Sequence, residues 1–332
     1  MIVTVTPNPS LDRTLDVPDL VVGGVNRAAG RHVEPSGKGV NVTRALAING
    51  VESVAVLPSG GPEGEQVLRL LEAESVRYVA VPIREPVRVN ITVATVSGVA
   101  TKINEPGPTL TDSEVAALID AVLRTSRHGD WVVASGSLPP GVAADFYADL
   151  GSRLRAEGRR FALDTSGEAL RHGLAGRPEI LKPNLEELAE VAHRPLRTLG
   201  DVVAAAEDVQ QTTGGAVLVS LGAAGAVLVD GEPPLHAQAR VGEIRSAVGA
   251  GDNALAGFLA AIDAGRDRTA ALREAVAWGS AAVRAPGSLA PPVTDVDRQA
   301  VRLQPRLDLD RVVSDPRHAG TPFRPDTSAQ ED

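Results

Sequence analysis

Short apolar strand signals alternate with helix signals over most of the 332-residue chain. Strands are expected at 2–6, 53–57, 130–134, 160–163, 180–181 and 216–220, and helices at 39–49, 62–74, 143–157, 167–172, 184–192, 201–213, 250–264 and 269–284. This alternation predicts an α/β fold with a doubly wound, mostly parallel sheet and helices on both faces. Such sheets bind ligands at the carboxyl ends of their strands, so the loops that follow the strands are the candidate binding segments.

Two segments break this alternation, because 14–32 and 87–101 have strand signals with no helix between them. Residues 87–93 alternate apolar with polar or charged side chains, which is typical of a sheet with one face in water. We therefore expect a small β-sheet lid, formed by about 13–33 and 86–103, on an α/β domain spanning 1–289. Residues 290–332 form a C-terminal extension, and roughly the last 15 to 20 residues are expected to be disordered.

Composition excludes several classes of protein. The chain has no cysteine, which rules out disulfides and thiolate metal sites. A net charge of −9 and an aromatic content of 2% argue against a nucleic-acid binder, which needs a basic face or stacking platforms. The chain opens on a strand signal without a basic targeting segment, and its longest apolar stretch, 216–229, is interrupted by two glycines. We expect a cytoplasmic protein without a membrane partner.

The basic residues are distributed unevenly, since only three of the 33 are lysines. Lys38, Lys102 and Lys182 each lie beside Gly, Pro or Asn in a segment that reads as a loop. A compact ammonium group interacts with anions differently from a planar guanidinium group. The three lysines are therefore candidate contacts for an anionic ligand.

The strongest single motif is Gly-Ala-Gly-Asp at 249–252, immediately before an expected helix. The N–H groups at a helix N-terminus carry partial positive charge and can bind a phosphoryl group. Asp252 at this position can cap the helix or accept a proton from a hydroxyl nucleophile. The tetrapeptide alone leaves both interpretations open.

Four other loop segments have features of ligand sites. The Gly-Lys-Gly turn at 37–39 precedes a helix, Asp12 follows the first strand, and the segments 182–187 and 220–225 also follow strands. Each has a structural alternative: a tight turn, a turn acid, a capping box between Asn184 and Glu187, or a simple glycine turn. The chain lacks both the Walker A motif and the protein-kinase signatures, so any phosphoryl transfer requires another nucleotide-binding scheme.

Together, these segments resemble the PfkB-type sugar kinases, which are related to ribokinase. The resemblance covers residues 2 to 287 and depends on six motifs in the expected order: Asn-Pro-Ser-Leu-Asp at 8–12, Gly-Lys-Gly-Val-Asn at 37–41, Ser-Gly-Ser-Leu-Pro-Pro-Gly at 135–141, Asp-Thr-Ser-Gly at 164–167, Lys-Pro-Asn at 182–184 and Gly-Ala-Gly-Asp at 249–252. It implies a ribokinase-like fold and an ATP- and Mg²⁺-dependent kinase.

The resemblance also implies roles for individual residues. Asp252 is expected to be the general base, and Gly249, Ala250 and Gly251 the anion hole for the transferred phosphoryl group. The sugar side is expected to comprise Asp12, Arg27, Gly37, Lys38, Gly39, Asn41, Arg88 and Ser137, and the ATP side Lys182, Asn184, Ser220, Gly222, Gly225 and Ser280. Asn184 and Glu187 are expected to organise Mg²⁺ through water. Asn253 departs from the family pattern, in which Ser or Ala often follows the base, and a tuning effect is expected.

The substrate expected from the resemblance is a phosphorylated ketohexose. The segment 101–107 is similar to 1-phosphofructokinases and tagatose-6-phosphate kinases. The first expectation is conversion of fructose 1-phosphate to fructose 1,6-bisphosphate, and the alternatives are a 6-phosphofructokinase or a tagatose-6-phosphate kinase. A non-catalytic sensor of sugar phosphate or nucleotide is the alternative from a different class. The family also implies a homodimer formed through the lid.

Overall fold

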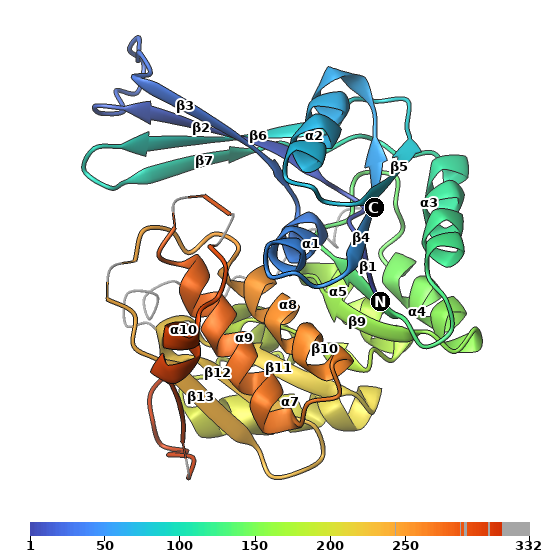
Figure 1. Cartoon of the computed structure of the whole chain (residues 1–332), viewed down its shortest axis with the longest axis vertical. Coiled ribbons are helices and arrows are strands. Elements are labelled where there is room, and N and C mark those ends of the chain that lie inside the picture. Colours follow the sequence, from blue (N-terminus) through green and yellow to red (C-terminus); the bar gives the residue numbers. More distant parts are fainter. Residues whose placement is uncertain (243, 286, 289–290, 305, 314–332) are drawn as a thin grey trace, which may run out of the picture.

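The computed structural model describes residues 1–242, 244–285, 287–288, 291–304 and 306–313. The C-terminal segment expected to be disordered falls almost entirely in 314–332, which lies outside the described residues. Figure 1 shows a main α/β body from which a small sheet projects on one side. None of the helices in the described ranges is long and apolar enough to cross a membrane.

Within the described residues, ten strands form the main sheet in the order β14-β13-β12-β11-β10-β9-β8-β1-β4-β5. The seven strands from β11 to β5 are mutually parallel, whereas β12, β13 and β14 add antiparallel pairs at the other edge. Their bounds are β1 Ile2–Val5, β4 Ser53–Ser59, β5 Tyr78–Pro82, β8 Trp131–Ser135, β9 Arg160–Asp164, β10 Ile180–Leu181, β11 Ala216–Ser220, β12 Ala226–Val229, β13 Leu235–Ala239 and β14 Val301–Leu303. The predicted doubly wound, mostly parallel sheet is confirmed.

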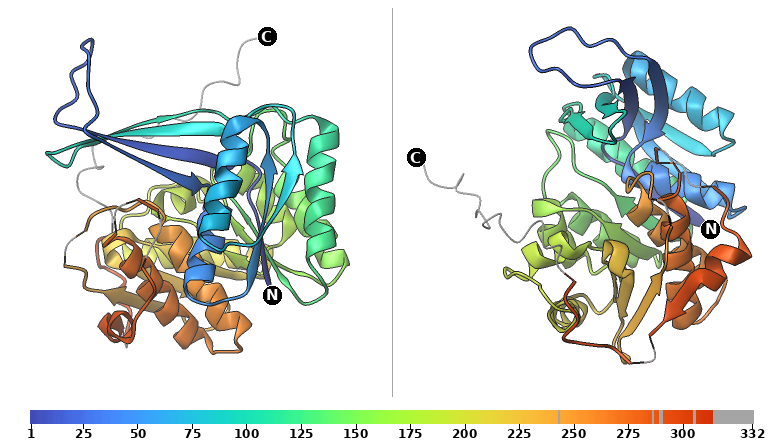
Figure 2. Two further views of the ribbon diagram at one scale, coloured as in Figure 1. Left: turned by 45° about the horizontal axis from the view of Figure 1, so that its top comes forward. Right: turned by 90° about the vertical axis from the view of Figure 1, so that its left-hand side faces the viewer.

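Helices cover both faces of this sheet (Figures 1 and 2). One apolar core is shared by α1, α8 and α9, and the other by α3, α4, α5, α6 and α7. The helices are α1 Lys38–Ile48, α2 Gly61–Ala73, α3 Asp112–Thr125, α4 Phe146–Ala156, α5 Gly167–Gly173, α6 Leu185–Val191, α7 Leu199–Thr213, α8 Ala250–Asp263, α9 Arg268–Ala282 and α10 Asp295–Ala300, with short 3₁₀ turns at Leu174–Gly176 (η1) and Gly222–Ala224 (η2). Since nearly continuous apolar strands are buried on both faces, the cores form without many aromatic side chains.

The small sheet has the strand order β3-β2-β6-β7, with bounds β2 Ser10–Val17, β3 Gly30–Ser36, β6 Arg88–Thr95 and β7 Ala100–Asn104. Its strands come from the two segments whose patterns broke the α/β alternation. A third apolar core joins this sheet to the main body through Leu11 on β2, Val40 on α1 and Val67 and Leu71 on α2. The small sheet therefore starts at the carboxyl end of β1 and extends away from the main body.

Several elements of the main body were not predicted from the sequence: α3, α10, β5, β13 and β14. The capping box between Thr111 and Glu114 marks the start of α3, and the Thr-x-x-Glu spacing is the sequence signal for this helix. Residues 301–303 pair with β13, so part of the segment after residue 290 contributes an edge strand to the main sheet. An edge strand of three residues has too little periodicity to be identified from sequence.

Candidate active site

The parallel strands β1, β8, β9, β10 and β11 lie side by side, so the loops at their carboxyl ends meet along one edge of the sheet. These loops contain Asn8, Ser137 and Lys182, and the strands β9 and β11 end at Asp164 and Ser220. Helices α1 and α8 pack against each other and begin near this edge. The sequence segments that were expected to carry chemistry are therefore brought to one place.

A buried ionic cluster lies at the centre of this edge. The carboxylate of Asp164, which is fully buried, accepts a hydrogen bond of 2.8 Å from Lys38 Nζ and lies 3.2 Å from Lys182 Nζ. Burial would raise the pKa of Asp164, but the charges of Lys182 and Lys38 lower it below the usual value. Two ammonium groups are thus held around one ionised acid.

Lys38 bridges two acids, because its ammonium group also lies 3.2 Å from Glu187 Oε1. Burial works to lower the pKa of Lys38, but the carboxylates of Asp164, Glu187 and Asp252 outweigh burial and raise the pKa above its usual value. Lys38 is therefore a permanent cation in the folded protein. It is positioned by the turn at Gly37, whose φ of +120° places the backbone against Thr6 and starts α1.

Asp252 lies in the first turn of α8 and is 7% exposed. Asn41 Nδ2 donates a hydrogen bond of 2.8 Å to its Oδ2. Burial and the nearby charge of Asp164 raise the pKa of Asp252 to about 6, while Lys38, Asn41 and Lys182 act in the opposite direction. A carboxyl group with a pKa close to the working pH is suited to accept a proton from a hydroxyl group.

The turn before Asp252 has the geometry of an anion-binding helix start. Gly249 has φ +75°, and its carbonyl accepts a hydrogen bond of 2.8 Å from Asn253 Nδ2. Because α8 begins at Ala250, the N–H groups of Gly251 and Asp252 have no partners within the helix, whereas those of Ala250 and Asn253 donate to the carbonyls of Ala247 and Gly249. Lys182 Nζ lies beside Gly251, 3.2 Å from the position that a Cβ atom would occupy. The side chain of Asn253 therefore stabilises the Gly249 turn. This is a structural role for Asn253, which stands where members of the family often have Ser or Ala.

Polar groups of the small sheet and the β1 loop form a second part of the site. Asp12 Oδ1 accepts hydrogen bonds of 2.7 Å from Ser10 Oγ and 2.9 Å from Asn90 Nδ2. Asn8 Nδ2 donates to Ser137 Oγ over 3.3 Å. The side-chain oxygens of Asn8, Asn41 and Asn90 are buried but accept no hydrogen bond from the described protein. Unpaired buried acceptors are costly, so this part of the site is suited to a ligand with several hydroxyl donors.

Arg88, at the start of β6, is directed back toward the β1 loop. Its guanidinium donates hydrogen bonds to the carbonyls of Asn8, over 3.0 Å, and Glu105, over 3.1 Å. Burial lowers the pKa of Arg88, and Asp12 and Glu105 oppose that effect. Arg27, by contrast, is exposed in the connection between β2 and β3 at the far end of the small sheet (Figure 1), and Lys102 is exposed on β7.

The segments expected on the nucleotide side surround the next loops along the same edge. Asn184 and Glu187 form a reciprocal capping box at the start of α6, with both hydrogen bonds at 2.8 Å. Ser220 at the end of β11 forms a bridge with Asn184. Gly222 and Gly225 belong to the turn between β11 and β12, and Ser280 is half-buried on α9. Asn184 and Glu187 therefore do cap the helix, which was the structural alternative to a role in ligand binding. The second carboxylate oxygen of Glu187, Oε1, still faces Lys38.

Three residues at the centre were missed as site residues. Asp164 belongs to a motif used for the resemblance, and its position at the end of a strand was the available signal. Asn8 also lies after a strand and within such a motif. Asn90 gave no signal of its own, because it lies inside β6 and meets Asp12 only when β2 and β6 pair.

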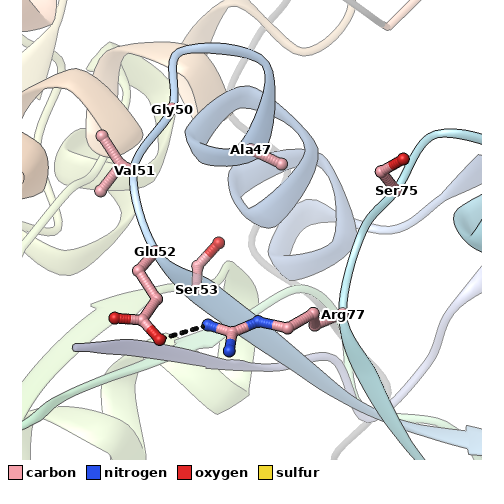
Figure 3. A pocket seen from close by; sticks show the side chains of 7 residues that line it. All are labelled: Ala47, Gly50, Val51, Glu52, Ser53, Ser75 and Arg77. Carbon is pink, nitrogen blue, oxygen red and sulfur yellow. Dashed lines mark hydrogen bonds and ion pairs between the residues drawn. The ribbon is translucent and has the colours of Figure 1, made fainter.

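A separate surface hollow lies at the amino end of β4, away from the carboxyl edge of the sheet (Figure 3). It has a volume of about 280 Å³ and is lined by the end of α1, the start of β4 and the ion pair of Glu52 with Arg77. This hollow contains none of the candidate site residues. A second hollow of about 230 Å³ adjoins the carboxyl edge and is lined in part by Ser137 and Ser166.

Comparison with known proteins gives a consistent result. The family model described as pfkB family carbohydrate kinase matches residues 6–295. The chain is 34% identical to a 1-phosphofructokinase of Bacillus subtilis (strain 168), over 85% of this chain and 92% of the relative. It is 38% identical to the ATP-dependent 6-phosphofructokinase isozyme 2 of Escherichia coli (strain K12), over 75% and 84% of the two chains.

Among solved structures, the chain is similar to the crystal structure of phosphofructokinase-2 from Escherichia coli in complex with fructose-6-phosphate. The TM-score is 0.82 with 34% sequence identity, and the match covers 90% of this chain and 96% of the other. The similarity therefore includes both the main sheet and the elements around its carboxyl edge.

Proposed function

The chain belongs to the pfkB family of carbohydrate kinases, and on this basis we propose that it transfers the γ-phosphoryl group of ATP to a phosphorylated ketohexose. The first candidate is fructose 1-phosphate, which would be converted to fructose 1,6-bisphosphate. The observation that carries the proposal is the buried Asp252, which lies directly behind the Gly249 turn and within the field of Lys38 and Lys182. The first turn of α8 thus combines a base for the attacking hydroxyl with N–H groups for the transferred phosphoryl group, and phosphoryl transfer depends on both.

In the proposed reaction, the carboxylate of Asp252 accepts the proton of the attacking sugar hydroxyl. The hydroxyl oxygen forms a bond to the γ-phosphorus, the bond from phosphorus to the bridging oxygen breaks, and ADP leaves. Asn41 orients the carboxylate through its hydrogen bond of 2.8 Å. With a pKa of about 6, Asp252 is mostly ionised at neutral pH and can still take up a proton.

The charge of the transferred phosphoryl group is proposed to be stabilised by the N–H groups at the start of α8 and by Lys182. The ammonium group of Lys182 lies beside Gly251 and is held there by Asp164. Fixed donors in a water-poor site stabilise developing charge without reorganising during the reaction. Gly249, Ala250 and Gly251 contribute backbone groups only, which explains why small residues suffice.

Mg²⁺ is proposed to enter with ATP. No group of three or more acidic or histidine side chains able to hold a metal occurs in the described part of the chain. Mg²⁺ in kinases is typically held by one or two carboxylates together with water and substrate phosphates. Glu187 fits this arrangement, since Oε1 is directed toward Lys38 rather than into the helix cap, and Asn184 is its neighbour. Bound Mg²⁺ would neutralise phosphate charge at this edge.

The preference for a phosphosugar is proposed to depend on the small sheet. Asp12 and the three unpaired amide oxygens would bind sugar hydroxyls, and Lys38 and Arg88 would face the existing phosphate. Arg27, which was also expected there, is exposed at the far end of the small sheet and is not part of this proposal. Relatives named both 1-phosphofructokinase and 6-phosphofructokinase isozyme 2 have similar identity to this chain. A 6-phosphofructokinase is therefore the second candidate, and a tagatose-6-phosphate kinase is a third on the same scaffold.

A non-catalytic sensor of sugar phosphate or nucleotide is the alternative from a different class. The ionic cluster disfavours it, because a binding module has no need for a buried acid held at a pKa of about 6 beside an anion hole. Keeping such an acid costs stability, and that cost is typical of catalytic sites rather than of binding sites.

The proposal is tested by ADP release from ATP-Mg²⁺ with fructose 1-phosphate, fructose 6-phosphate, tagatose 6-phosphate and unphosphorylated fructose. We expect kcat/KM to be highest for one of the three sugar phosphates, with fructose 1-phosphate first. Preference for unphosphorylated fructose would overturn the phosphosugar assignment. Tight binding of a sugar phosphate without ADP release would favour the sensor.

We also propose that the small sheet is a lid, that it mediates a homodimer, and that the protein works in the cytoplasm, where ATP is available. Several exposed apolar side chains lie on this sheet and its loops: Val21, Val22, Val25, Val96, Val99 and Ile103. Exposed apolar side chains gathered on one element are typical of an interface. The molar mass in solution, measured by light scattering, tests the dimer.

A further inference from the structure

Arg44 joins three segments that are distant in sequence. It lies on α1, is 2% exposed, and donates Nε and Nη2 to the carboxylate of Glu74 over 2.6 and 2.7 Å. Its Nη1 donates to the carbonyl of Pro35 on β3 over 3.0 Å and to Ser288 Oγ over 2.8 Å. One buried guanidinium therefore holds the end of α2, the small sheet and the turn at 287–288 together.

The turn at 287–288 also contacts the small sheet directly. The backbone N–H of Ser288 donates to Glu34 Oε2 on β3 over 3.3 Å. A Cβ atom on Gly287 would lie 2.4 Å from the same carboxylate oxygen, so the backbone approaches Glu34 closely. Glu34 Oε1 is in turn 3.6 Å from Arg44 Nη2. Arg44, Glu34 and Ser288 thus form one connected, buried unit.

The same turn lies against the anion hole. A Cβ atom on Gly249 would lie 3.0 Å from the carbonyl oxygen of Ser288 and 3.4 Å from its Cα. Gly249 begins the turn from which the N–H groups of α8 extend. Ser288 therefore lies beside Gly249, in the space where a side chain at position 249 would have to fit.

We propose that Arg44 is a positioning residue that couples the small sheet to the Gly249 turn. The sheet is the side of the site where the sugar phosphate is proposed to bind, so the inference rests on the proposed function. Glu34 and Pro35 on β3 contact Ser288 and Arg44, and Ser288 lies beside Gly249. A sugar phosphate that binds against the small sheet would therefore stabilise this unit together with the Gly249 turn, which favours phosphoryl transfer to the sugar over transfer to water.

The contacts of Arg44 fall into two parts that can be separated by mutation. Glu74 neutralises the guanidinium in a bidentate pair away from the anion hole, whereas Pro35 and Ser288 are neutral acceptors next to the sheet and the turn. Lysine could satisfy only part of this set, because its ammonium lacks the planar fork. Ser288→Ala removes one contact on the turn side and leaves the ion pair with Glu74 intact.

The experiment compares Ser288→Ala and Arg44→Lys with matched controls far from the small sheet. Ser126→Ala removes a buried hydroxyl that donates to Val122 over 2.8 Å, and Arg159→Lys removes a guanidinium that donates to the carbonyls of Leu123 and Ser126. We expect Ser288→Ala to lower kcat about tenfold, the size of effect of one hydrogen bond to a charged group, with KM for ATP nearly unchanged. ATP hydrolysed per sugar phosphorylated should rise.

Amide hydrogen exchange gives a readout that a purely structural role would not move. In the wild-type protein, the sugar phosphate that is phosphorylated fastest should protect both 30–36 and 246–253. In Ser288→Ala, protection should remain at 30–36 and be lost at 246–253. If Arg44→Lys does not fold, Ser288→Ala and Glu34→Gln provide the same comparison.

The positioning role would be overturned if the wild-type protein is active and Ser288→Ala matches Ser126→Ala in three measurements: kcat, ATP hydrolysed per sugar phosphorylated, and amide hydrogen exchange. The proposed function would then remain in place. Wild-type protein that phosphorylates none of the sugars would overturn both.

Discussion

The side-chain amide of Asn41 donates a hydrogen bond of 2.8 Å to the carboxylate of Asp252, 211 positions further along the chain. The bond joins the first turns of α1 and α8, which pack against each other. It places an oriented, buried acid at the carboxyl edge of the sheet, and the following predictions depend on that acid and its neighbours.

Replacing Asp252 with Asn should remove the proton acceptor and keep its shape. We expect kcat to fall by at least about 10²-fold, because general-base catalysis typically contributes this much. ATP affinity, measured by calorimetry, should change little. Asp145→Asn, at the start of α4, is a control that should leave kcat unchanged. Near-normal turnover of the Asp252 variant would exclude this residue as the base.

The rate should depend on pH through the same group. The pKa of Asp252 is raised to about 6 and the ionised form is the base, so kcat/KM should rise with pH through about 6 and then level off. Asn41 lowers the pKa of Asp252, so Asn41→Ala should move the acid limb to higher pH. Asn49→Ala at the end of α1 is the control. An acid limb that stays in place in Asn41→Ala would argue against this link.

Asp252 should also cost the fold stability at neutral pH. Its pKa is 3.8 in the unfolded chain and about 6 in the folded one, so the folded state binds more protons between these values. Stability therefore falls as pH rises from about 4 to 6 and stays lower above 6. Two pKa units correspond to roughly 3 kcal/mol, so Asp252→Asn should raise Tm at pH 8 and have little effect near pH 4. Thermal scans at both pH values would check this; a lower Tm at pH 8 would contradict it.

Glu187 and Glu186 form a matched pair for testing the metal. Both lie in the first turn of α6, but Glu187 is buried and faces Lys38, whereas Glu186 is exposed. Glu187→Gln should increase the Mg²⁺ concentration needed for half-maximal rate about tenfold, an effect typical of groups that support a metal indirectly. Titration of free Mg²⁺ at fixed ATP measures this change. Glu186→Gln should behave as wild type, and an equal effect of both substitutions would point to helix charge alone.

A comparison of Arg88 with Arg84 distinguishes specific binding of the sugar phosphate from a general effect of removing one positive charge. Arg88 is directed into the β1 loop, whereas Arg84 is exposed. Arg88→Gln should raise KM for the sugar phosphate roughly tenfold to a hundredfold, as expected for loss of a charge-assisted bond. Activity on unphosphorylated fructose should hardly change. The ratio of the two kcat/KM values is the measurement, with Arg84→Gln as control, and an unchanged ratio would remove Arg88 from the phosphate site.

Much of the fold could be predicted because its signals are local. Apolar runs such as 2–5 and 216–220 identify strands, and turns such as Gly-Lys-Gly at 37–39 identify helix starts. The resemblance, based on six ordered motifs, is confirmed by the family match to residues 6–295. The segments without a helix between their strands, 14–32 and 87–101, became the small sheet. Elements with weak local signals, such as β14, were missed.

The sequence by itself therefore determined the fold class, the family and the identity of Asp252 as a candidate base, because each depends on residue types at short spacing. The tertiary structure alone decided that Lys38 and Lys182 share Asp164, that Asn90 meets Asp12, and that Arg44 reaches Ser288. These contacts join segments that are between 18 and 244 positions apart. Their existence depends on strand register and helix packing, and burial then sets the charges and pKa values, which no local pattern encodes.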